Sequence, residues 1–285
     1  MGFEYVEPRD VEEAVRIRSA VPGAYLLAGG TDLMLRVRLR QVNPRLVVGV
    51  GRLPELVGIE ETAEGGLSLG AAATLCAIAR SAVGREIAPL LTEVCGRTRS
   101  PQVRTLATIG GTLCAASPLA EPTLCLLALG ASVRLRGAGG ERTLALDDFL
   151  VGPGQTALRP DEILLSVLLE APTPGTRTAY ERLTRREAIE APLIASAVSL
   201  TMDGKGVCRS ARVALGVAMP RPVRLPDVEA ALAGRRLDSA TVQAAAQAAG
   251  AVEVRDDVRA SKEYRQRMAP VVVGRALARA LGAVG

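Results

Sequence analysis

The stretch that decides the fold is LLAGGTDL, residues Leu26–Leu33, where a short apolar run leads directly into Gly-Gly-Thr. The same order recurs in ATIGGTL, residues Ala107–Leu113, with Gly110 standing 81 positions after Gly29. Paired glycines lack a Cβ, so backbone N–H groups can turn into one concavity, and a neighbouring threonine hydroxyl can bind a phosphate oxygen or cap a helix. One such loop is more simply explained as a tight turn. Two of them, each expected to leave a strand, predict a diphosphate held between the loops.

Other nucleotide-binding motifs are missing from the sequence. The best match to GxGxxG is Gly49-Val50-Gly51, which runs into Leu53-Pro54 and lacks the third glycine, and no GxxxxGK[ST] occurs. The remaining interpretation is a dinucleotide bound outside a Rossmann fold.

The composition excludes several kinds of chemistry. The 285 residues include no histidine, which removes every histidine-based triad and every histidine metal site. Only two phenylalanines, four tyrosines and no tryptophan are present, too few for a base-stacking nucleic-acid surface. The five cysteines form no CxxC pair, which argues against a local iron–sulfur site and for reduced, buried thiols. No catalytic residue and no metal ligand is therefore expected in this chain, and its chemistry should come from a bound cofactor.

The first half alternates short strand-like and helical runs. Asp10 is placed to cap a helix reaching Ala20, with Glu13 at capping-box spacing. Residues 74–99 read as two helices broken around Val83-Gly84, and residues 101–118 as a turn-rich segment. A helix over 119–129 and a hairpin over 131–146 follow.

The second half contains four extended runs, 163–169, 178–184, 194–202 and 207–218, which predict an antiparallel sheet. Helices are expected over 227–233, 239–249 and 262–281, the last bent or interrupted at Pro270. The pattern as a whole predicts an α+β protein.

The chain resembles the flavoprotein (medium) subunits of the molybdenum hydroxylases, a family that includes carbon monoxide dehydrogenase and xanthine dehydrogenase. The resemblance rests on the first loop, on PQVRTLATIGGTL at 101–113 with Ala116-Ser117-Pro118, and on ASKEYR at 260–265. It extends over essentially the whole length. It implies a two-lobed FAD-binding fold of the PCMH type, with an N-terminal α/β lobe (1–55), a second, mixed α/β FAD-binding lobe (56–172) and a C-terminal antiparallel sheet with helices (173–285).

The resemblance also implies which residues bind FAD. Residues 27–32 and 108–112 would wrap the diphosphate and ribityl chain. Ser117 and Glu121 would reach the adenosine half or the ribityl hydroxyls, and Leu164 and Arg182 would lie near the ring system. The implied cofactor-binding residues are Leu27, Ala28, Gly29, Gly30, Thr31, Asp32, Thr108, Gly110, Gly111, Thr112, Ser117, Glu121, Leu164 and Arg182.

Two of these positions depart from the family pattern, because relatives usually have Asn at Thr112 and Asp at Glu121. The residues alone also leave simpler roles open. Glu121, next to Pro122, could simply cap the helix that follows, and Arg182 could be an exposed strand residue.

The function implied by the resemblance is electron transfer. Electrons from the 2Fe–2S clusters of a small subunit, delivered from a molybdopterin large subunit, would pass through FAD to an acceptor such as NAD, a quinone or oxygen. The expected assembly is a dimer of heterotrimers. The 4-hydroxybenzoyl-CoA reductase subunit of this family carries a cysteine-rich insert, and its absence here counts against that activity.

Two alternatives remain open from the sequence: a self-sufficient flavin oxidoreductase with the same fold, and a scaffold protein that has lost its flavin. No apolar run approaches the 18 residues that span a bilayer and no signal peptide is evident, so we expect a cytoplasmic protein without nucleic-acid partners.

Overall fold

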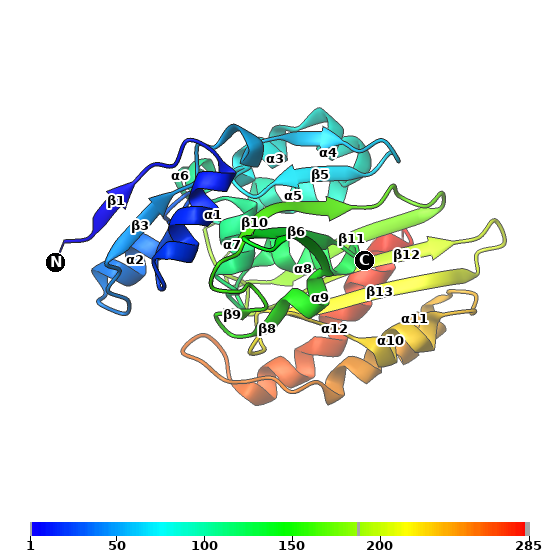
Figure 1. The fold of residues 1–285 in the computed structure, drawn as a ribbon. Helices are drawn as coiled ribbons and strands as arrows, with labels where there is room; N and C mark the ends of the chain where they lie inside the picture. Colours follow the sequence, from blue (N-terminus) through cyan, green and yellow to red (C-terminus); the bar gives the residue numbers. More distant parts are fainter. Residues whose placement is uncertain (1, 187–188, 283–285) are drawn as a thin grey trace. The chain divides into compact units, whose positions relative to one another are not determined.

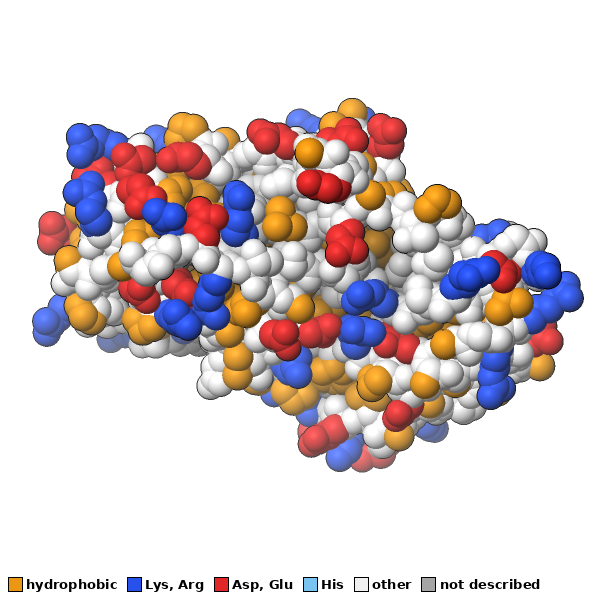
Figure 2. Space-filling model, turned by 45° about the vertical axis from the view of Figure 1, so that its right-hand side comes forward, with side chains coloured by type: hydrophobic (Ala, Val, Ile, Leu, Met, Phe, Trp, Pro, Cys, Tyr) orange, Lys and Arg blue, Asp and Glu red, His pale blue; other side chains and the backbone are white. Residues whose placement is uncertain are grey.

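The computed structural model describes residues 2–186 and 189–282. The chain forms two compact units. Their helices and strands are labelled in Figure 1. The first unit contains residues 1–96, 100–116 and 131–171, and the second contains residues 97–99, 117–130 and 172–285. Acidic and basic side chains are intermixed over the face shown in Figure 2, in keeping with a net charge of only +5.

The first unit begins with a three-stranded parallel sheet of order β1-β3-β2. Its elements are β1 (Glu4–Val6), α1 (Val11–Ala20), β2 (Tyr25–Leu27), α2 (Leu33–Arg38) and β3 (Leu46–Gly49). The predicted cap of α1 is confirmed, since the Asp10 carboxylate accepts a hydrogen bond from the Glu13 backbone N–H at 2.7 Å. Because β2 and β3 are parallel neighbours, the loops that follow them leave from the same edge of the sheet.

A five-stranded sheet of order β4-β5-β10-β6-β7 completes the first unit. Its strands are β4 (Ile59–Glu61), β5 (Leu67–Gly70), β10 (Ile163–Leu169), β6 (Ser132–Gly137) and β7 (Gly140–Ala145). Smaller elements are η1 (Pro54–Leu56), α9 (Leu146–Phe149), β8 (Leu150–Gly152) and β9 (Gln155–Thr156). The prediction that residues 163–169 join the C-terminal sheet is wrong, because β10 pairs with β5 and β6.

Short helices follow β5 along the chain, and here the predicted boundaries fail. The helices are α3 (Leu75–Arg80), α4 (Ala82–Ile87), α5 (Pro89–Arg97), α6 (Pro101–Leu106) and α7 (Ile109–Cys114). The break expected at Val83-Gly84 falls instead at Ser81, whose hydroxyl accepts from the Gly84 N–H and starts a new helix. The segment expected to be turn-rich holds two helices capped by Ser100 and Thr108.

The second unit is an antiparallel sheet covered by helices, as the sequence predicts, but its fourth strand is the short β14 and not residues 163–169. The sheet has the order β11-β12-β13-β14. Its elements are α8 (Glu121–Ala128), β11 (Thr176–Leu183), β12 (Ile194–Met202), β13 (Cys208–Gly216), β14 (Val223–Arg224), α10 (Pro226–Leu232), α11 (Ser239–Gln247), η2 (Ala248–Ala251) and α12 (Lys262–Ala280). One face of this sheet packs against α10–α12 through residues such as Ala179, Val198 and Val213. Successive side chains of a strand point to opposite faces, so Tyr180 lies on the other face of the sheet.

Helix α12 runs through Pro270 without interruption. No helix in residues 2–186 and 189–282 is both long and apolar enough to cross a membrane.

The ASKEYR motif at 260–265 fixes the loop before α12. Ser261 caps the helix, and Arg265, only 1% exposed, reaches the Asp257 carboxylate at 2.8 Å and the Arg255 carbonyl at 2.6 Å. Burial alone would raise the pKa of Asp257, but hydrogen bonds from Arg259 and Arg265 outweigh it and hold the pKa well below its ordinary value. The motif is therefore explained by local architecture.

We predict that Asp257→Asn lowers the free energy of unfolding at pH 7 by about 1.5 kcal/mol, the low end for a hydrogen bond to a charged group, because the carboxylate is about one-third exposed. A depressed pKa contributes stability that is present above the unfolded pKa near 3.9 and is lost as the pH falls toward the folded value. The difference from wild type should therefore shrink below about pH 4 in urea titrations. Asp256→Asn is the matched control, and an equal effect of both variants would contradict the prediction.

Candidate functional site

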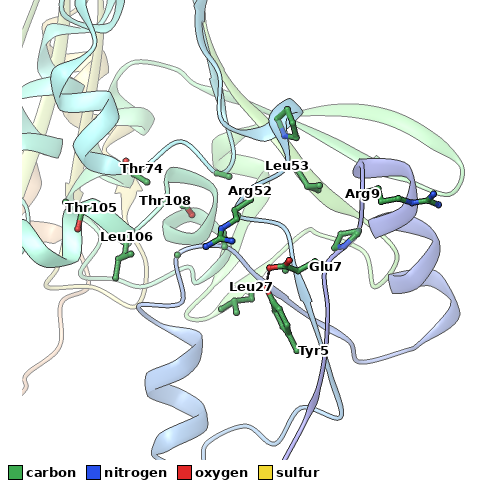
Figure 3. A pocket seen from close by; sticks show the side chains of 17 residues that line it. Tyr5, Glu7, Arg9, Leu27, Arg52, Leu53, Thr74, Thr105, Leu106 and Thr108 are labelled. Carbon is green, nitrogen blue, oxygen red and sulfur yellow. Dashed lines mark hydrogen bonds between the residues drawn. The ribbon is translucent and has the colours of Figure 1, made fainter.

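A cavity of about 480 Å³ lies in the first unit, within the size range of small-molecule sites (Figure 3). Its walls come from the first Gly-Gly-Thr loop and from the segment that leads into the second. The first loop contributes Leu27, Ala28 and Gly29, and the second segment contributes Thr105, Leu106 and Thr108. The structure thus brings together two stretches that the sequence places about 80 residues apart.

The first loop and the second segment meet at Gly29. A Cβ on this residue would lie 1.8 Å from the Leu106 carbonyl oxygen, which is backbone and cannot swing aside. The next residue, Gly30, has φ +70°, a conformation that glycine adopts without steric cost. Glycine is therefore required at these two positions for different reasons. Gly29 permits close contact with the other segment, and Gly30 permits the turn.

The first loop keeps its backbone donors free. The N–H groups of Gly29, Gly30 and Thr31 donate no hydrogen bond to any described residue. Successive N–H groups around a left-handed residue form a concave anion site. A loop with such donors is chemically suited to an oxyanion.

The second loop is different, and the expectation of a strand followed by free donors is wrong there. Thr108 starts α7, and Gly110, Gly111 and Thr112 lie within that helix. Their N–H groups already donate, to the Ala71 carbonyl (2.8 Å), the Thr108 hydroxyl (3.1 Å) and the Thr108 carbonyl (2.9 Å). Gly110 is needed because a Cβ would lie 2.6 Å from Ala71, so its role is close packing.

Threonine hydroxyls supply the second side of the cavity with donors. Thr74 and Thr108 lie side by side in an isolated antiparallel bridge. Each hydroxyl oxygen accepts a backbone N–H, from Ala77 and Gly111 respectively, so each O–H remains able to donate. Free N–H groups on one side and hydroxyls on the other can bind a phosphate or diphosphate group.

Several lining residues were not predicted from the sequence, among them Tyr5, Glu7 and Arg52. A signal for Arg52 was available, because it follows Gly49-Val50-Gly51 at the end of β3. Since β2 and β3 are parallel neighbours, residues after β3 emerge beside the loop that follows β2. Because Gly49-Val50-Gly51 lacks the third glycine of GxGxxG, the residues that follow it were not considered as ligand-binding residues from the sequence.

Three predicted residues belong to the second unit: Ser117, Glu121 and Arg182. Glu121 is the first residue of α8 and only 3% exposed. Its carboxylate accepts hydrogen bonds from the Thr98 hydroxyl (2.7 Å), the Tyr180 hydroxyl (2.6 Å) and Arg182 Nη1 (3.1 Å). The exposed-strand alternative for Arg182 is wrong, because its side chain is 11% exposed and paired with Glu121.

The environment of Tyr180 keeps its hydroxyl protonated. Burial, and then the neighbouring Glu121 carboxylate, raise the pKa of Tyr180 well above its ordinary value. The phenol is therefore a permanent donor to Glu121. Thr98, Glu121, Tyr180 and Arg182, which we call the Glu121 cluster, form one buried polar network in the second unit.

The remaining predicted residues are placed as follows. Leu164 is buried in β10 of the first unit. Thr31 and Asp32 are exposed, and the Ser117 hydroxyl accepts from the Leu119 N–H at 3.3 Å. The Asp32 carboxylate lies 3.9 Å from Arg36 Nη1 and makes no cap hydrogen bond to α2.

Comparison with known proteins identifies close similarity along the whole chain. Residues 1–172 match the family described as the FAD binding domain in molybdopterin dehydrogenase, and residues 178–280 match the CO dehydrogenase flavoprotein C-terminal domain. The chain is 34% identical to the carbon monoxide dehydrogenase medium chain of Hydrogenophaga pseudoflava over 96% of both chains. It is 28% identical to the xanthine dehydrogenase FAD-binding subunit of Escherichia coli O157:H7, over 99% of this chain and 97% of that one.

Solved structures agree with the sequence comparison. Carbon monoxide dehydrogenase from Hydrogenophaga pseudoflava superposes with a TM-score of 0.95 at 33% identity, covering 100% of this chain and 99% of the other. Quinoline 2-oxidoreductase from Pseudomonas putida 86 gives a TM-score of 0.92 at 28% identity, covering 99% and 98%.

We predict that Gly29→Ala lowers the free energy of unfolding by about 3 kcal/mol, the upper end of the usual cost of overpacking, because the new methyl group meets a backbone carbonyl. Gly139→Ala is the control, since a Cβ there meets nothing within 4 Å, and it should change stability by less than about 0.5 kcal/mol. Urea denaturation measures both. Equal stability of the two variants would show that the loop contact tolerates a side chain.

We predict that Glu121→Ala lowers the free energy of unfolding by about 3–5 kcal/mol, because Arg182 and Tyr180 lose their shared buried acceptor. Tyr180→Phe, which removes one donor, should cost about 1.5 kcal/mol. Glu86→Ala replaces an exposed glutamate and serves as the reference, with an expected change below about 0.5 kcal/mol. A loss for Glu121→Ala no larger than the reference would mean that the cluster does not stabilise the unit.

Proposed function

Because this chain belongs to the family of FAD-binding medium subunits of the molybdenum hydroxylases, we propose that it passes electrons from the 2Fe–2S clusters of a partner subunit to an external acceptor. The family membership makes the chain an oxidoreductase subunit with FAD as its cofactor. When bound, FAD supplies the exchange between one-electron and two-electron transfer. The chain itself supplies position, polarity and access.

The observation that carries the proposal is the cavity bordered by both Gly-Gly-Thr segments. Gly29, Thr74 and Thr108 line this cavity, and the N–H groups of Gly30 and Thr31 follow Gly29 in the same loop. The free N–H groups of the loop and the donor hydroxyls of the two threonines suit a diphosphate, the group that distinguishes FAD from FMN. We propose that the first loop binds the diphosphate directly. The second loop would contribute through Thr108, while Gly110 permits close packing of α7 against Ala71.

We keep the whole predicted set as the proposed cofactor-binding residues. They are Leu27, Ala28, Gly29, Gly30, Thr31, Asp32, Thr108, Gly110, Gly111, Thr112, Ser117, Glu121, Leu164 and Arg182. For Glu121 the proposed contact uses the acceptor capacity left after three hydrogen bonds, on a carboxylate whose orientation Tyr180 and Arg182 fix.

For the organisation of the chain we propose the parts 1–55, 56–172 and 173–285. This division is supported by the sheets, since each sheet lies entirely within one part.

For the partners we propose a 2Fe–2S small subunit and a molybdopterin large subunit, assembled as a dimer of heterotrimers. Relatives named as a medium chain of carbon monoxide dehydrogenase and an FAD-binding subunit of xanthine dehydrogenase support separate subunits.

We predict that the purified chain releases equimolar FAD on denaturation. The physical reason is that a diphosphate can use the free donors of the first loop, whereas a single phosphate leaves part of them unmet. Chromatography of the released flavin measures this. Equimolar FMN would contradict the proposal.

We also predict that carbon monoxide, xanthine or aldehydes do not bleach the flavin band of the isolated FAD-loaded chain under anaerobic conditions. Adding the cognate small and large subunits should produce substrate-dependent bleaching. Bleaching without partners would favour a self-sufficient flavoenzyme.

A further inference from the structure

The cavity has an end that the Gly-Gly-Thr loops do not account for. Tyr5, Glu7 and Arg52 gather there, and Figure 3 shows the Arg52 guanidinium turned toward the Tyr5–Glu7 pair while Arg9 points away. These residues come from β1, from the chain just after it, and from the loop after β3. The end is therefore part of the first unit.

Arg52 is the cation available to a ligand at this end. Of the two arginines lining the cavity, Arg9 is held by Glu13, through its Nε at 3.0 Å and its backbone N–H at 2.8 Å. Arg52 makes no hydrogen bond or ion pair with residues 2–186 or 189–282. A guanidinium left without a carboxylate beside a set of free N–H groups is suited to a phosphate.

The backbone fixes Arg52 next to the first loop. Val50 N–H donates to the Leu27 carbonyl at 2.8 Å, and a Cβ on Gly51 would lie 3.0 Å from the Ala28 carbonyl oxygen. On its other side, Leu53 is buried. The chain before and after Arg52 is therefore anchored, and its side chain starts from a defined position close to Gly29.

Glu7 offers acceptors at the same end. Its carboxylate accepts one hydrogen bond from the Tyr5 hydroxyl at 2.9 Å, and the Tyr5 ring end lies against Gly49, where a Cβ would fall 2.2 Å from the hydroxyl oxygen. The remaining lone pairs of Glu7 can accept from ribose hydroxyls or an exocyclic amine. A free cation beside a free acceptor matches a nucleotide, which has both phosphate and hydroxyl groups.

We propose that Arg52 and Glu7 recognise the AMP half of FAD, with Arg52 pairing with a phosphate and Glu7 accepting from ribose hydroxyls, and that they set the preference of this chain for FAD over FMN. This inference rests on the proposed FAD site. It adds two residues and assigns them a selectivity role.

The test compares Arg52→Gln with Arg9→Gln in the full chain. Both variants remove an arginine from the cavity wall, but only Arg52 is unpaired. Dissociation constants for FAD, FMN and ADP are measured by flavin fluorescence and calorimetry on apoprotein. For Arg52→Gln we expect FAD and ADP to bind about 10–100-fold more weakly while FMN changes less than about twofold. Arg9→Gln should leave all three within about twofold.

Two further variants sharpen the assignment. Arg52→Lys keeps the charge but loses the bidentate fork, so it should recover part of the FAD affinity. Glu7→Gln should weaken FAD and ADP about tenfold without affecting FMN. Thermal unfolding of each apoprotein should match wild type, since Arg52 and Glu7 are both exposed and the amide oxygen introduced by Glu7→Gln can still accept from the Tyr5 hydroxyl.

The outcomes separate this inference from the proposed function. If wild type binds FAD and Arg52→Gln binds it equally well, or if Arg9→Gln is equally impaired, the role of Arg52 is overturned and the FAD site stands. If wild type binds ADP in an Arg52-dependent way but not FAD, the site is a nucleoside-diphosphate site and the proposed function fails. Wild type that binds neither ligand overturns both.

Discussion

The contact between Gly29 and the Leu106 carbonyl is the constraint on which the candidate site depends. A side chain of any size at residue 29 would collide with backbone, so the loop after β2 could not approach the segment entering α7. That approach closes the cavity between Ala28–Gly29 and Thr105–Thr108. The N–H groups of residues 29–31 donate no hydrogen bond to residues 2–186 or 189–282.

The two Gly-Gly-Thr segments are alike in sequence but adopt different structures, a loop in the first and the start of a helix in the second. In the first, Gly30 turns the chain through positive φ and leaves donors for a ligand. In the second, the same residues start a helix whose donors are satisfied by Thr108 and Ala71. Glycine is compatible with either outcome. Thr108, two positions before Gly110, caps a helix, whereas the first segment has Leu27 at the equivalent position, which has no side-chain oxygen to cap with.

Predictions from local chemistry succeeded where the deciding contacts are local. Asp10 caps α1 as expected, and the hairpin of β6 and β7 forms around its glycines. Predictions failed where partners are distant. β10 is buried on both faces like β12, so its residues do not indicate that its neighbours are β5 and β6. The sequence likewise allows Arg182 to be an exposed strand residue, because its partner Glu121 lies 61 positions earlier in the chain.

The sequence by itself determined the α+β class and the cap of α1, because these follow from periodicity and capping within a few residues. From the same local chemistry it predicted a diphosphate at the glycine loops. The tertiary structure alone decided which loop keeps its donors, that Arg52 and Glu7 share the cavity with Gly29, and that Glu121 sits in a buried cluster. The physical reason is that folding decides which groups lie near a donor, a cation or a carboxylate, and therefore whether it has a hydrogen-bond or ion-pair partner. Such groups lie tens of residues away, where no local pattern records them.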